Sequence, residues 1–144
     1  MREIVGDLFN YQLDDASILR CVTTNGVLNK NQELVMGAGV ALRAKILYPN
    51  LPKILGELVL KHGNHVHLIE NIKIASFPTK HDWKDPSDLQ LIEQSCQELV
   101  EKEDGWDYIV LPRVGAGMGR LAWSDVRQVL EKYFDSDKYL ILVQ

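Results

Sequence analysis

The sequence is poor in cysteine and contains no long apolar run. Its 144 residues include two cysteines, Cys21 and Cys96, whose spacing fits neither a disulfide framework nor a metal-binding motif. We expect both to be buried small hydrophobes. The first residues form no apolar signal segment, and no run approaches the ~18 apolar residues of a membrane span. The sequence therefore argues against a disulfide-stabilised or membrane protein and favours a cytoplasmic one.

An excess of positive charge is also absent. The chain has 16 lysines and arginines against 20 aspartates and glutamates, a net charge of −4. This argues against nucleic-acid binding by general phosphate neutralisation, although a local basic patch remains compatible with it. With 46% hydrophobic and 25% charged residues, the composition is that of an ordinary globular protein. The length predicts one domain, residues 1–144, and we expect a monomer.

Apolar runs of strand length alternate with helical patterns along the chain. Strands are predicted at 2–5, 18–22, 65–68, 72–77, 108–111 and 139–143, and helices at 39–48, 51–62, 86–104 and 125–133. Such alternation predicts an α/β fold, a three-layer α/β/α sandwich with a central mixed six-stranded sheet.

Local signals mark the ends and burial of these helices. Asn50, Asp85 and Ser124 are the expected N-terminal caps. The helix at 39–48 is apolar apart from Arg43 and Lys45, which predicts burial on most of its sides.

Two glycine loops are the clearest candidates for a ligand-binding site. Gly37-Ala38-Gly39 runs directly into a predicted helix, and Gly115-Ala116-Gly117-Met118-Gly119 follows a predicted strand. Glycines allow positive φ and let several N–H groups point at one place, and a helix start adds its positive end. Two such loops favour a ligand with more than one phosphate, although each could be an ordinary turn.

Other predicted strands also end in polar residues. Asp7, Asn25 and Lys80 each follow a strand. In open α/β sheets ligands bind at the carboxyl ends of the strands, so we expect these residues and the glycine loops to lie near one crevice.

The spacing excludes the common nucleotide motifs. Neither glycine loop matches G-x-G-x-x-G with its distant acidic residue, and no G-x-x-x-x-G-K-[ST] occurs. The four histidines offer no persuasive metal cage, and His65 and His67 are expected to be solvated strand residues. We expect neither a metal nor a cofactor.

Three segments together resemble the macrodomain family of ADP-ribose binders. They are Gly6-Asp7-Leu8-Phe9, Met36 to Leu42, and Leu111 to Trp123, and they occur in the family's order over nearly the whole chain. Within the family, the similarity is to the branch of the terminal ADP-ribose protein glycohydrolase and of the antitoxins that reverse DNA ADP-ribosylation.

The resemblance implies a role for each segment. Asp7 would accept a hydrogen bond from the adenine amino group with Leu8 beside it, and Asn25 would lie near the distal ribose, although it could be a simple turn residue. The first loop would hold a phosphate and the distal ribose, and the second would clasp the diphosphate. The implied ligand-binding residues of these loops and of the Lys80 segment are Gly37, Ala38, Gly39, Val40, Thr79, Val114, Gly115, Ala116, Gly117 and Met118.

Lys80 is the implied catalytic residue. In Phe77-Pro78-Thr79-Lys80 it would act on the anomeric carbon of the distal ribose, as a nucleophile or as a stabilising charge. Lys84 or a protonated His81 could supply a neighbouring cation, and the alternative is a solvated surface lysine.

One position departs from the family pattern. Gly119 stands where the protein glycohydrolase carries an aspartate, and Asp82 is either a substitute for that carboxylate or an ordinary loop residue.

The resemblance implies hydrolysis of the glycosidic bond that joins terminal ADP-ribose to a protein acidic side chain or to a DNA base. Its partners would be ADP-ribose and ADP-ribosylated protein or DNA, with no membrane. Two alternatives stay open: a non-catalytic reader of ADP-ribose, and a phosphatase acting on ADP-ribose 1″-phosphate.

Overall fold

The computed structural model describes residues 1–144. In chain order its elements are β1 (Arg2–Val5), β2 (Ile18–Thr24), α1 (Gly39–Leu47), α2 (Leu51–His62), β3 (Leu68–Ile69), the 3₁₀ turn η1 (Glu70–Ile72), β4 (Ile74–Pro78), α3 (Leu89–Val100), β5 (Tyr108–Pro112), the 3₁₀ turn η2 (Gly117–Gly119), α4 (Trp123–Tyr133) and β6 (Tyr139–Val143).

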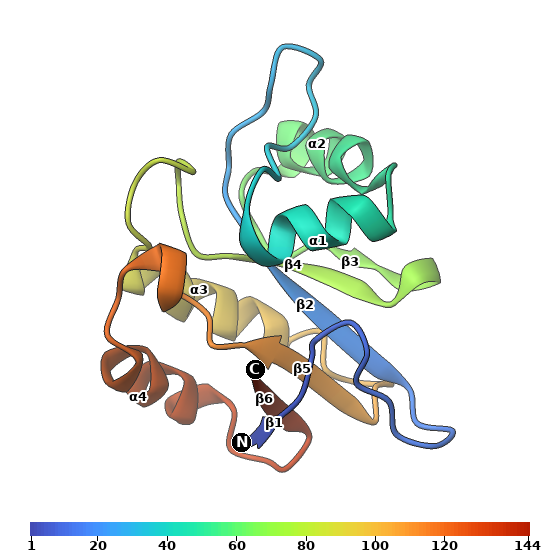
Figure 1. Ribbon diagram of the computed structural model, residues 1–144, viewed down its shortest axis with the longest axis vertical. Helices are drawn as coiled ribbons and strands as arrows, with labels where there is room; N and C mark the ends of the chain where they lie inside the picture. The colour runs from blue at the N-terminus through green and yellow to red at the C-terminus, as the bar shows by residue number, and fades with distance from the viewer.

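One six-stranded sheet runs through the molecule in the order β1-β6-β5-β2-β4-β3. Every neighbouring pair is parallel except β3 with β4. Helices α1 and α2 lie on one side of the sheet and α3 and α4 on the other (Figure 1). The predicted three-layer sandwich with a mixed sheet is confirmed.

Strand β2 shows how the sequence builds both faces of this sheet. Leu19 and Cys21 enter the core under α3 and α4, whereas Val22 packs in the core under α1 and α2. Successive side chains of a strand point to opposite faces, so an apolar run without alternation buries both. Both cysteines are free and buried, and burial raises the pKa of each thiol.

Helix α1 is less buried than its composition predicts. Ala44 is its one fully buried residue, and Leu42, Ile46 and Leu47 are exposed. The prediction of burial on most sides was wrong because this nine-residue helix packs against β2 and α2 along one side only, which leaves the other sides in solvent.

Two predicted caps and one predicted strand also differ in the structure. Helix α3 begins after Asp88, whose side chain accepts from the Gln90 N–H, so Asp85 and Pro86 lie before the helix. The N-terminal cap of α4 is Ala122, which puts Ser124 inside the first turn. Strand β3 is only two residues long, because the chain at 65–67 is held by side chains of β4 and α3.

Asn50 does occupy the cap position of α2, but its side chain makes no capping hydrogen bond. No helix is both long enough and apolar enough to cross a membrane.

Candidate functional site

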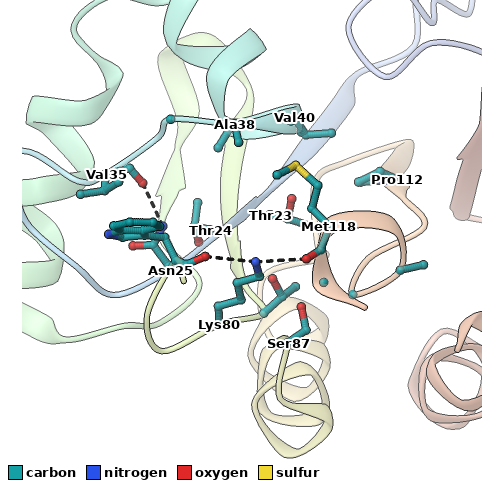
Figure 2. Close-up of a pocket in the computed structure, with 18 of the residues that line it drawn as sticks. Thr23, Thr24, Asn25, Val35, Ala38, Val40, Lys80, Ser87, Pro112 and Met118 are labelled. Carbon is teal, nitrogen blue, oxygen red and sulfur yellow. Dashed lines mark hydrogen bonds between the residues drawn. The ribbon is translucent and has the colours of Figure 1, made fainter. Parts of the chain in front are cut away.

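A cavity of about 590 Å³ opens where β2, β4 and β5 end. These strands are adjacent and parallel in the sheet, so their carboxyl ends meet at one edge. Figure 2 shows the lining side chains arranged around it. The lining residues are Thr23, Thr24, Asn25, Val35, Gly37, Ala38, Gly39, Val40, Ala41, Thr79, Lys80, Trp83, Ser87, Pro112, Arg113, Gly115, Ala116, Met118 and Gly119.

The first glycine loop forms one wall and leads into α1. Gly39 has φ +57°, and a side chain at Gly37 would meet nothing within 4 Å. Ala38 caps α1 without a side-chain hydrogen bond, and the first turn carries no acidic residue. The first N–H groups of a helix have no partner within it, so this helix start can receive an anionic group.

The second glycine loop forms the opposite wall. Gly115 and Gly117 have φ +75° and +64°. The exposed Met118 reaches across the cavity, with its sulfur 3.6 Å from the position of a Cβ on Gly39. In Figure 2 its side chain extends towards Ala38 and Val40. The two glycine loops therefore face each other across a single cavity.

Lys80 lies between the walls. Its Nζ donates to the carbonyl oxygens of Trp83 and Met118, each at 3.3 Å, as the dashed lines in Figure 2 show. Its backbone is held by Asn64, whose side-chain amide donates to the Lys80 carbonyl oxygen at 3.1 Å. The ammonium group thus links the Lys80 loop to the second glycine loop.

The cations expected beside Lys80 are both paired with carboxylates. His81 lies 2.8 Å from Asp88, which lowers the pKa of that carboxyl group, and Lys84 lies 3.8 Å from Asp82. Asp82 also accepts from the Lys84 N–H and does not line the cavity. Asp82 is therefore an ordinary loop residue outside the cavity lining.

Asn25 lines the cavity but also shapes the chain around it. Its side-chain oxygen accepts from the Val27 N–H at 2.8 Å, and its amide donates to the Val35 carbonyl at 2.9 Å. These bonds are those of a turn residue that fixes the start of the 25–35 loop. The turn interpretation of Asn25 describes this geometry well.

Four residues of the predicted set lie outside the cavity lining: Asp7, Leu8, Val114 and Gly117. Leu8 and Val114 are buried in the core. Asp7 forms a two-pronged ion pair with Arg43 of α1, with one contact at 2.9 Å, and accepts from Gln144. The Arg43 guanidinium lowers the pKa of Asp7. Both oxygens of the Asp7 carboxylate therefore have partners.

Several lining residues were not predicted from the sequence. Ser87 and Thr24 carry hydroxyl groups, and the half-exposed Trp83 adds an aromatic face. Arg113 also lines the cavity, with its guanidinium paired to Glu3. For Trp83 the sequence pattern did not separate core from rim. In the sequence, these residues share only a position next to the end of a strand or helix. Many other residues share this position, so it does not identify lining residues without the fold.

The lining is electrostatically one-sided. It contains Lys80 but neither aspartate nor glutamate. Arg113 also lines the cavity, but its guanidinium pairs with Glu3 at 3.2 Å and lies over the Trp123 ring. Lys80 therefore supplies the unpaired positive charge, which favours an anionic ligand. No group of three or more His, Cys, Asp or Glu side chains is arranged to hold a metal ion.

The structure is thus an α/β/α sandwich whose cavity lies between two glycine loops at the carboxyl ends of parallel strands. The chain belongs to the macrodomain family, in the branch that includes the DNA ADP-ribosyl glycohydrolases and the ADP-ribose glycohydrolase OARD1. No protein-family model matches it.

Three comparisons support this membership. The DNA ADP-ribosyl glycohydrolase of Mycobacterium tuberculosis is 31% identical over 129 residues, which are 81% of this chain and 36% of the relative. The ADP-ribose glycohydrolase OARD1 of Bos taurus is 27% identical over 149 residues, covering 97% of this chain and 88% of the relative. The macrodomain structure of Mycobacterium tuberculosis DarG matches with a TM-score of 0.81 and 26% identity, over 99% of this chain and 97% of that one.

The chain thus spans about a third of the length of the DNA ADP-ribosyl glycohydrolases that it matches.

Proposed function

We propose that the protein binds ADP-ribose in this cavity and hydrolyses the glycosidic bond of terminal ADP-ribose attached to protein acidic side chains or to DNA bases. The observation that carries the proposal is the position of Lys80, whose ammonium lies in the cavity between the two glycine loops. The names of the relatives, DNA ADP-ribosyl glycohydrolase and ADP-ribose glycohydrolase, support the same reaction class.

The geometry suits different parts of the cavity to different parts of the ligand. The start of α1 suits a diphosphate, because its free N–H groups face a lining that contains no carboxylate. The distal ribosyl unit would then lie towards Lys80. Asp7 would accept a hydrogen bond from the adenine amino group only if its carboxylate gave up its contact with Arg43 or Gln144.

Lys80 can act in two chemically distinct ways. As a nucleophile, its deprotonated amine attacks the anomeric carbon, the glycosidic bond breaks, and the leaving group keeps the electron pair and takes up a proton. Water then hydrolyses the Lys80–ribosyl bond, which releases ADP-ribose and restores the amine. As a positive charge, it stabilises the negative charge that develops on the leaving group while water attacks. The ammonium hydrogen bonds to two carbonyls in the structure support the second role.

Two substitutions of Lys80 test the proposal. Lys80→Ala should lower ADP-ribose release about 10²- to 10⁴-fold, the range for losing a proton donor or a stabilising charge, while free ADP-ribose still binds. Lys80→Arg keeps the charge without a comparable nucleophile, so residual activity in this variant favours the electrostatic role. Lys84→Ala is the matched control, because Lys84 lies in the same loop but does not line the cavity.

The assay follows release of ADP-ribose from an ADP-ribosylated single-stranded oligonucleotide and from an ADP-ribosylated protein, with calorimetry for binding. Binding of ADP-ribose without release from either substrate would establish the reader instead. The lack of any lining carboxylate favours this second candidate, because no acidic side chain is available as a general base. Phosphate release from ADP-ribose 1″-phosphate would point to the phosphatase. We further propose that the protein acts as a monomer, which sedimentation would test.

A further inference from the structure

Ser87 occupies a distinctive place in the cavity wall. It lies between the Lys80 loop and the start of α3, and its N–H donates to the Gly119 carbonyl at 2.9 Å. Only 7% of the residue is exposed, and it lines the cavity. The loop that carries Lys80 is therefore joined to the second glycine loop at two points, by the Lys80 ammonium and by the Ser87 backbone.

The Ser87 hydroxyl is free of partners within the protein. None of the side-chain hydrogen bonds involves it, whereas the similarly buried Ser95 donates to the Pro78 carbonyl. Most buried polar side-chain atoms have a hydrogen-bond partner, so a free hydroxyl in a cavity wall is the kind of group that a ligand pairs. The hydroxyl of Thr24, which also lines the cavity, is likewise buried without a partner.

Gly119 is the reason that Ser87 can take this position. A Cβ on Gly119 would lie 2.3 Å from the Ser87 Oγ and 3.2 Å from its Cβ. A side chain at 119 and the hydroxyl of Ser87 therefore compete for the same space. The backbone of Gly119 is not in the left-handed region, so the conflict is with Ser87 alone.

We propose that Ser87 is a specificity-determining residue whose hydroxyl hydrogen-bonds the distal ribosyl unit of the ligand. The hydroxyl adjoins the turn that holds the Lys80 ammonium through the neighbouring Met118 carbonyl. A hydroxyl both donates and accepts, which suits a sugar hydroxyl better than a phosphate. This inference rests on the proposed function, since Lys80 marks the ribosyl end of the cavity.

The test compares two ligands that differ only at that end, ADP-ribose and ADP. Ser87→Ala should weaken ADP-ribose binding about tenfold, the equivalent of one hydrogen bond, and leave ADP binding unchanged. Gly119→Ala should show the same selective loss, because the new methyl group displaces the hydroxyl. Ser95→Ala is the matched control, since it removes a buried serine hydroxyl outside the cavity and should change neither affinity.

Calorimetry on the full chain separates the outcomes, with thermal unfolding showing that each variant is folded. If the unmodified protein binds both ligands and Ser87→Ala weakens both equally or neither, the role of Ser87 is refuted while the proposed function stands. If the unmodified protein binds neither ligand, the proposed function fails and the role of Ser87 fails with it.

Discussion

Three glycines of the two loops differ in what a methyl group would meet, and this difference predicts an order of stabilities. Gly37 has no positive φ and open space around a Cβ. Gly117 has φ +64° and open space. Gly115 has φ +75°, and its Cβ would lie 2.7 Å from the Ile92 Cδ1 and 3.3 Å from the Leu121 Cδ1. Alanine substitutions therefore separate backbone strain from overpacking within one site.

The expected costs follow from these geometries. Gly37→Ala should be neutral or stabilising by up to about 1 kcal/mol, because it restricts only the unfolded chain. Gly117→Ala should cost about 1–2 kcal/mol for a left-handed alanine. Gly115→Ala adds about 1–3 kcal/mol of overpacking in the core beside Ile92, for a total of about 2–5 kcal/mol.

Urea unfolding followed by circular dichroism measures these free energies directly. A loss of about 2–5 kcal/mol is a large part of the ~5–15 kcal/mol that stabilises a typical domain, so it is readily resolved. If Gly115→Ala proves no more destabilising than Gly117→Ala, then the contact with Ile92 is not tight and the reasoning about this loop is refuted.

Two further predictions concern the helix cap and pH. Asp88→Ala should lower stability by about 1 kcal/mol because it removes the capping bond to Gln90. Asp85→Ala changes an exposed position before the helix and should have almost no effect. Equal melting temperatures for the two variants would contradict this prediction. Burial lowers the pKa of His67 in the folded protein below its usual 6.5. Below pH 6.5 the unfolded chain therefore binds a proton at His67 that the folded chain does not. The free energy of unfolding should fall as the pH drops from 6.5 towards the pKa of the folded state. Urea titrations at several pH values should show this fall in the unmodified protein and not in His67→Gln.

Much of the fold could be predicted from local sequence. Both glycine loops and five of the six strands were located because apolar runs and glycine spacing are local properties, whereas the strand expected at 65–68 overlaps β3 only at Leu68. The predicted caps Asp85 and Ser124 failed for the opposite reason. Several polar residues near a helix start are chemically suitable, and packing decides which one begins the helix.

The sequence alone determined the α/β class and the two glycine loops, because these follow from periodicity and from residue type. The resemblance to the macrodomain family pointed to Lys80, whose catalytic role stays a prediction. Only the tertiary structure decided that Asp7 is paired with Arg43 and that Ser87 stands where a side chain on Gly119 would be. Those contacts join residues 36 and 32 positions apart in the chain. No local pattern encodes such a distance, since it is set by how the parallel strands bring their carboxyl ends together.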